Sequence, residues 1–101
     1  MEDTIAAVAT AYGEGGIGII RISGEEALPI LQEIFEFHGD ADTFTSRRMT
    51  DGKIIDKEKN QIIDEVLAVY MKGPKTYTAE DVVEINCHGS MVSLRKTLAL
   101  V

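Results

Sequence analysis

Residues 12–24, YGEGGIGIIRISG, decide whether this chain has a dinucleotide-binding fold. Their glycines follow the spacing Gly-x-Gly-x-x-Gly, which Gly18 completes. In a dinucleotide fold such a loop leads directly into a helix, whose first amide groups bind the pyrophosphate. Here it leads into residues 19–23, a run rich in β-branched side chains that favours a strand. Because residues 4–10 also have strand character, we expect the glycines to join two strands and to bind no dinucleotide.

Length and composition indicate a single globular domain. A chain of 101 residues suffices for one modest core, and 45% hydrophobic with 27% charged residues is typical of a folded protein. The net charge of -7 would repel a phosphate backbone, so direct nucleic-acid binding is not expected. The single cysteine excludes an internal disulfide, and residues 1–16 contain neither a basic leader nor a long apolar run. We therefore expect a cytoplasmic protein without a membrane span.

A helix is predicted after the first pair of strands. Residues 23–26 fit a capping box, in which Ser23 bonds a first-turn amide and Glu26 bonds back. Apolar residues then recur at the three-to-four spacing of an amphipathic helix. They are Ala27, Leu28, Leu31, Ile34 and Phe35. Pro29 has no amide hydrogen, so either the helix begins nearer Leu28 or its first turn is distorted. Residues 38–40 are expected to end the helix and residues 42–46 to form a loop.

The second half of the chain predicts a hairpin, a central strand and a last helix. Residues 53–56 and 61–64 flank a turn and form the hairpin. Residues 66–71 are apolar on both alternations, which indicates a central strand covered on both faces. Residues 81–88 are the last strand candidate, and apolar residues at helical spacing follow. They are Met91, Leu94, Leu98 and Val101. We predict an α+β fold, with a mixed, mostly antiparallel sheet and helices packed on it.

Two lone charges lie within the predicted strands. Alternation places Arg21 on the same face as Ile19, and Glu84 on the same face as Asn86. One interpretation is structural, in which both charges lie on solvated faces or pair with each other. The other is a polar heteroaromatic ligand, because a carboxylate accepts two parallel N–H donors and an arginine donates two hydrogen bonds to a carbonyl or carboxylate. A pterin has such a donor edge, but the pattern alone does not choose a folate over other ligands.

The remaining reactive residues are better explained as structural. A structural zinc site needs four ligands, and the only histidine besides His88 is His38, which lies far from Cys87 without metal-ligand spacing. We interpret Cys87 as a small core residue and His88 as a strand-end residue near the ligand or dimer region. Adjacent acidic residues occur at 64–65 and at 80–81. Neighbouring side chains on a strand point to opposite faces, so neither pair forms an acid/base dyad by itself. We therefore predict no catalytic residue and no metal site.

Three stretches of the chain resemble a known family. They are DTIAAVATAYGEGGIGIIRISG at residues 3–24, VYMKGP at 69–74 and YTAEDVVEINCHGS at 77–90. In this order they resemble the N-terminal domain of the MnmE (TrmE) family of tRNA modification GTPases. The resemblance covers nearly all of the chain and is weakest between His38 and Gln61. The chain departs from it at Ala11 and Tyr12, where the family usually has two prolines, and at Ser90, where it has a second glycine.

The resemblance implies a folate-binding domain like that of aminomethyltransferases over residues 1–101. Its ligand would be a tetrahydrofolate derivative, 5-formyl- or 5,10-methylene-tetrahydrofolate, and the domain would form a homodimer. The folate contacts of the family carry over to Arg21 and Glu84, and hydrogen-bond chemistry assigns Glu84 to the pterin edge. In complete family members, the protein and its partner MnmG (GidA) add a carboxymethylaminomethyl group to the wobble uridine of certain tRNAs. The acidic domain itself would reach tRNA only through this complex.

Several parts that the resemblance implies are absent from the 101 residues. They are a further folate-contacting lysine, the Gly-x-x-x-x-Gly-Lys-Ser/Thr phosphate loop, the helical domain and a C-terminal cysteine motif. We therefore expect GTP, magnesium and potassium to belong to the full-length protein and this chain to be non-catalytic alone. Because no residue closes the last predicted helix, we interpret the chain as part of a longer protein. The alternatives are a dimerisation domain without folate and a free-standing aminomethyltransferase-like enzyme.

Overall fold

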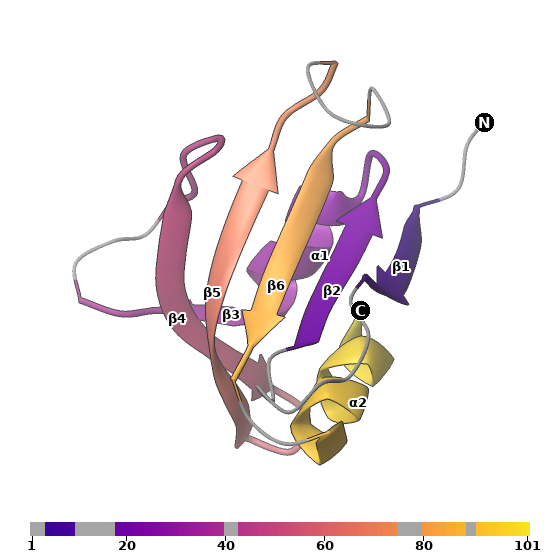
Figure 1. The fold of residues 1–101 in the computed structure, drawn as a ribbon. Coiled ribbons are helices and arrows are strands. Elements are labelled where there is room, and N and C mark those ends of the chain that lie inside the picture. The colour runs from indigo at the N-terminus through magenta and orange to yellow at the C-terminus, as the bar shows by residue number, and fades with distance from the viewer. Residues whose placement is uncertain (1–3, 10–17, 40–42, 75–79, 89–90) are drawn as a thin grey trace.

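The computed structural model describes residues 4–9, 18–39, 43–74, 80–88 and 91–101. In this part, six strands form one sheet and two helices accompany it (Figure 1). In chain order the elements are β1 (Ile5–Val8), β2 (Gly18–Ser23), α1 (Ala27–Ile34), β3 (Phe35–Phe37), β4 (Met49–Asp56), β5 (Gln61–Met71), β6 (Val82–Cys87) and α2 (Met91–Leu100). The strand order is β1-β2-β6-β5-β4-β3, and every described pairing is antiparallel. The predicted α+β class is confirmed.

One face of the sheet packs against both helices and forms the hydrophobic core. Paired residues on neighbouring strands share this face, as Ile20 with Ile85 and Ile22 with Val83 do. The fully or nearly buried core side chains from the sheet are Ile20, Ile22, Phe35, Ile54, Val66, Ala68, Tyr70, Val83, Ile85 and Cys87. The helices add Ala27, Leu31, Ile34 and Leu94. Each large aliphatic side chain buried in this way contributes roughly 1.5–3 kcal/mol, so this layer holds the helices to the sheet.

The opposite face of the sheet has no helix in the described part of the chain, and we call it the open face. Its side chains alternate with those of the core along each strand. Register pairing places Arg21, Glu84 and Val69 in one row across β2, β6 and β5. The next row contains Ile19, Asn86 and Leu67. The central position of β5 is confirmed, but among the described elements helices cover only its core side.

The glycine-rich stretch joins strand to strand, as predicted. β1 and β2 are antiparallel neighbours, with Ile5 opposite Ser23 and Val8 opposite Ile20. A strand rather than a helix therefore follows the glycines, and the geometry of a dinucleotide loop is excluded. The loop glycines at 13 and 15 and the departures at residues 11, 12 and 90 lie outside the described residues.

The start of α1 differs from the predicted capping box. Glu26 is the N-cap residue and makes no side-chain capping bond, while the Ser23 hydroxyl donates to Glu80 Oε2 at 2.9 Å. Instead, the Glu26 amide donates to Oγ1 of Thr4 at 3.1 Å. Pro29 is the third residue of α1, where an amide has no intrahelical acceptor, so its missing N–H costs the helix no hydrogen bond.

The end of α1 also differs from the prediction. The helix stops at Ile34, and Phe35 begins the short edge strand β3, so residues 38–40 do not end the helix. Phe35 makes an edge contact with Phe37, at a centroid distance of 4.9 Å, and packs over Gly52 of the neighbouring strand. A side chain at position 52 would collide with the Phe35 ring and with the Glu36 carbonyl. The ring therefore occupies a space that only a glycine on β4 provides.

The remaining elements agree with the predictions apart from their ends. β4 and β5 form the hairpin around residues 57–60, with the Lys59 amide donating to Asp56 Oδ1 at 3.2 Å. β4 begins at Met49, which is earlier than predicted. β6 and α2 lie within the predicted last strand and helix. No helix of the described residues has the length and apolar character needed to cross a bilayer.

Candidate functional site

The two predicted charges meet on the open face. Arg21 and Glu84 are direct register partners across β2 and β6. The arginine Nε and Nη2 both donate to Oε2 of Glu84, at 2.8 and 2.6 Å. The predicted possibility that the two residues pair with each other is therefore confirmed, and the pairing is compatible with a ligand at the same place.

Both side chains of the pair stay accessible from solvent. The Arg21 side chain is 48% exposed and that of Glu84 is 22% exposed. Because Oε2 receives both bonds, Arg21 Nη1 and Glu84 Oε1 have no hydrogen-bond partner among the described residues. The pair thus presents one charged donor and one charged acceptor to solvent. A solvent-exposed ion pair of this kind contributes only about 0–1 kcal/mol to stability.

The register neighbours of the pair on β1 and β5 are apolar. Ala7 lies opposite Arg21 on β1, and Val69 lies opposite Glu84 on β5. In the neighbouring row, the Asn86 side-chain amide donates from Nδ2 to the Leu67 carbonyl at 3.0 Å. A few polar groups on an apolar surface are the usual composition of a small-molecule site. This arrangement suits a planar ligand with hydrogen-bonding edges.

Glu80 and Asp81 lie just before the start of β6 and bond to different structural partners. Asp81 Oδ1 accepts from the Gly73 amide at 2.9 Å, and the Asp81 carbonyl accepts from the Gly24 amide at 2.9 Å. Glu80 accepts from the Ser23 hydroxyl. Burial raises the pKa of the nearby Tyr70 phenol, and the negative charge of Asp81 raises it further. The two carboxylates therefore hold loops together and form no dyad, as predicted.

Cys87 and His88 are placed as structural residues. Cys87 is 2% exposed within the core, which confirms its predicted role. Burial, with a smaller effect of Asp64, raises the pKa of its thiol to about 11, so the group is protonated at neutral pH. His88 Nδ1 lies 3.3 Å from the Glu65 carbonyl, whereas His38 Nδ1 lies 3.1 Å from Asp51 Oδ2 near the opposite edge of the sheet. The described residues contain no group of three potential metal ligands.

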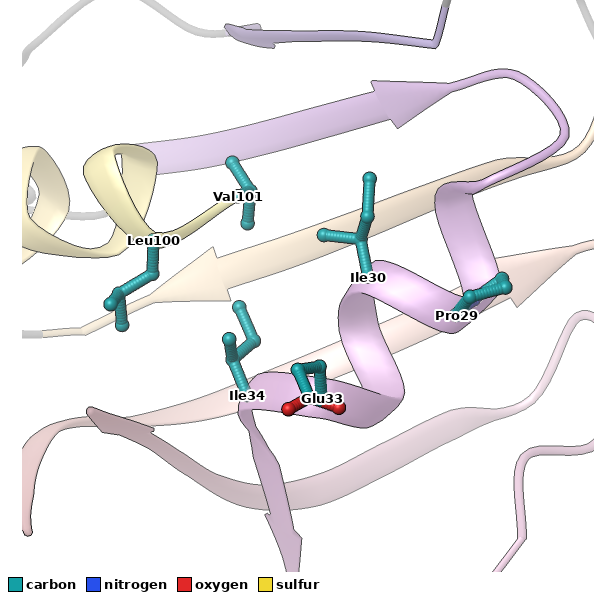
Figure 2. A pocket seen from close by; sticks show the side chains of 6 residues that line it. All are labelled: Pro29, Ile30, Glu33, Ile34, Leu100 and Val101. Atoms are coloured by element: carbon teal, nitrogen blue, oxygen red, sulfur yellow. The ribbon is translucent and has the colours of Figure 1, made fainter. Parts of the chain in front are cut away.

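A separate cleft lies on the helical side of the sheet. Figure 2 shows it between α1 and the end of α2. Its volume is about 260 Å³, and its lining residues are Pro29, Ile30, Glu33, Ile34, Leu100 and Val101. Glu33 is the one charged residue in this lining. The cleft therefore lacks the converging polar groups that orient a polar ligand, and it shares no residue with the Arg21–Glu84 pair.

The sequence did not predict the contacts of two residues, one on the open face and one at the start of α1. Asn86 was placed on the face of Glu84 but given no function, although its spacing of two residues from Glu84 was the available signal. Thr4 caps α1 from a segment that lies 22 residues earlier, and no local pattern predicts such a contact.

The fold and the charged pair define the class of the molecule. It is a small α+β domain with a helix-covered core and an open sheet face that presents paired donor and acceptor groups. The chain belongs to the family described as GTP-binding protein TrmE N-terminus, whose family model matches residues 4–101.

Curated relatives of the chain agree with this family. Over 103 residues it is 56% identical to the tRNA modification GTPase MnmE of Alkaliphilus metalliredigens (strain QYMF) and 54% identical to that of Clostridioides difficile (strain 630). Each alignment covers 100% of this chain and 22% of the relative. Over 99 residues, it is 54% identical to the MnmE of Desulfotalea psychrophila (strain LSv54 / DSM 12343), covering 98% of this chain and 21% of that protein. The chain spans about a fifth of the length of these relatives.

Proposed function

We propose that residues 1–101 form the tetrahydrofolate-binding domain of a tRNA modification GTPase, with Arg21 and Glu84 as its ligand contacts. The observation that carries this proposal is the position of the two side chains. They lie side by side on the open face, each with a hydrogen-bonding group directed to solvent. Membership of the TrmE N-terminus family supports the proposal, because the resemblance described above implies folate contacts at these two residues.

The groups present fit the chemistry of a folate. Glu84 Oε1 can accept from the amino edge of a pterin, and Arg21 Nη1 can donate to a carbonyl or carboxylate of the same ligand. The half-buried apolar side chain of Leu67, in the neighbouring row, offers contact to a flat ring. Because the exposed ion pair is weak, sharing or rearranging it on binding costs little free energy. When bound, 5-formyl- or 5,10-methylene-tetrahydrofolate carries the one-carbon unit.

The wider role of the domain follows from its family. We propose that it forms a homodimer and acts within a longer protein that binds GTP, magnesium and potassium. With MnmG (GidA), that protein would add a carboxymethylaminomethyl group to the wobble uridine of certain tRNAs. The net charge of -7 favours contact with tRNA through other parts of the complex.

A dimerisation domain that binds no folate is the second candidate. The observation that favours it is apolar exposure, since Ile5 is 64% exposed and Met49 is 49% exposed, both on the open face. Surface apolar side chains of this kind are common in contacts between protein copies. Sedimentation equilibrium over a range of concentrations tests this candidate, because a chain that remains monomeric at high concentration would contradict it.

Isothermal titration calorimetry with 5-formyltetrahydrofolate tests the folate proposal. We expect saturable binding by the parent chain and at least about a tenfold loss in Glu84→Gln, which removes the charged acceptor while keeping the shape of the side chain. Glu36→Gln makes the same change at an exposed position of β3, at the far edge of the sheet, and serves as the matched control. Absence of binding by the parent chain, or equal binding by parent and Glu84→Gln, would overturn the proposed site.

A further inference from the structure

Asn86 is the next polar residue beyond Glu84 on the open face. The two residues are two positions apart on β6, so their side chains share a face at a separation of about 7 Å along the strand. In the sheet, Asn86 lies between Ile19 of β2 and Leu67 of β5. Asn86 is therefore a half-buried amide with apolar neighbours. A two-ring heterocycle bound by Glu84 is long enough to reach it.

The orientation of the Asn86 amide is determined by its partner. Nδ2 donates to the Leu67 carbonyl at 3.0 Å. A carbonyl oxygen can only accept a hydrogen bond, so the NH₂ group must face it and Oδ1 must point away. No described residue donates to Oδ1, and no side-chain nitrogen or oxygen among the described residues is both buried and unpartnered. Oδ1 is thus an accessible acceptor held in one direction on the open face.

We propose that Asn86 Oδ1 recognises the reduced state of the pterin ring. This inference rests on the proposed folate function and assigns selectivity to the same site. In reduced pterins the ring nitrogen N8 carries a hydrogen, whereas in folic acid N8 carries only a lone pair. An amide oxygen accepts a hydrogen bond from the N8–H group of a reduced pterin and is repelled by the N8 lone pair of folic acid. Glu84 binds the amino edge that all pterins share, and Asn86 selects those with an N8–H donor.

Three ligands separate this recognition from other effects of ring reduction. Tetrahydrofolate has hydrogens on both N5 and N8, 7,8-dihydrofolate has one on N8 alone, and folic acid has neither. If Asn86 accepts a hydrogen bond from N8, dihydrofolate binds about as tightly as tetrahydrofolate. If the protein instead recognises the N5 hydrogen or the puckering of the reduced ring, dihydrofolate binds about as weakly as folic acid.

The test is calorimetric titration of the full chain with each of the three ligands. We expect the parent to bind tetrahydrofolate and dihydrofolate at least about tenfold more tightly than folic acid. This is the usual size of the effect when one hydrogen bond is replaced by two acceptors that face each other. Asn86→Leu, which keeps the branched shape of the side chain but has no acceptor, should bring the three affinities within about threefold. Gln61→Leu makes the same amide-to-leucine change at the far start of β5 and is the matched control.

Each outcome has a definite meaning. Loss of the preference in Asn86→Leu, with the preference kept in Gln61→Leu, supports the inference. If Asn86→Leu keeps the preference, or weakens all three ligands equally, the inference is wrong while the proposed folate site stands. If the parent binds none of the ligands, both proposals are overturned. Asn86→Ala removes the same oxygen without added bulk and gives the same readout if the leucine variant does not fold.

Discussion

Arg21 and Glu84 face each other across β2 and β6, with Nη2 of the arginine 2.6 Å from Oε2 of the glutamate. Each side chain restricts the rotamers of the other, because the guanidinium donates twice to a single carboxylate oxygen. The arrangement leaves one donor and one acceptor directed to solvent. A pair that is ordered but only weakly stabilising suits a binding site better than a structural support, because its groups are positioned before the ligand arrives.

Removing either partner of the pair is expected to change stability little. Arg21→Ala and Glu84→Ala should each alter the free energy of unfolding by less than about 1 kcal/mol, because both side chains are accessible to water. Urea unfolding followed by circular dichroism measures this change. A loss above about 2 kcal/mol in both variants would assign the pair a mainly structural role and weaken the case for a ligand.

Gly52→Ala is expected to destabilise the fold. A methyl group at this position meets the Phe35 ring and the Glu36 carbonyl, and the carbonyl belongs to the backbone of β3. Such overpacking costs about 1–3 kcal/mol. Thermal unfolding measures the loss, and Lys53→Ala on the same strand is the control. If Gly52→Ala is as stable as the parent, the packing of Phe35 over β4 is less close than described.

Thr4→Val is expected to weaken the start of α1. The change removes the hydroxyl that accepts from the Glu26 amide and should cost about 0.5–2 kcal/mol, the usual range for loss of a cap. Thr4→Ser keeps the hydroxyl and should retain most of the stability. Equal melting temperatures for Thr4→Val and Thr4→Ser would show that this contact does not contribute.

Alkaline pH is expected to destabilise the chain through Cys87. Burial raises the pKa of the thiol from 9.0 to about 11, so between these values the unfolded chain releases the proton while the folded chain keeps it. The free energy of unfolding should therefore be unaffected by this group below about pH 9 and fall as the pH rises toward 11, by up to about 1.4 kcal/mol per pH unit. Urea unfolding at several pH values measures the slope. Cys87→Ala should have a shallower slope, and an unchanged slope in that variant would contradict the assignment.

Local sequence patterns predicted most of the elements but not the junction between α1 and β3. The β-branched run predicted β2, and the two Ile-Ile-Asp segments predicted the hairpin of β4 and β5. Phe35 continues the apolar spacing of α1, so the pattern extended the helix beyond Ile34 into the residues that form β3. Its strand conformation depends on the space above Gly52 and on pairing with Ile54, both on a strand that follows later in the chain. Contacts of this kind override local propensity.

The candidate site was predictable in its residues but not in its assembly. Alternation along a strand identified Arg21 and Glu84 as lone charges, and the family resemblance attached a ligand to them. The amide orientation of Asn86 was not predictable, since it depends on the Leu67 carbonyl of a neighbouring strand. The same holds for Thr4, whose hydroxyl replaces the predicted cap of α1.

The sequence by itself determined which face of its own strand each charge occupies, because side chains alternate with a period of two along any extended backbone. Only the tertiary structure decided that the face of Arg21 and the face of Glu84 are the same face, and that the two residues lie in one row. They are 63 residues apart, and their register depends on how the other sides of β2 and β6 bury Ile20, Ile22, Val83 and Ile85 against the helices. A shift of one residue would expose this core, so its burial aligns the two charges.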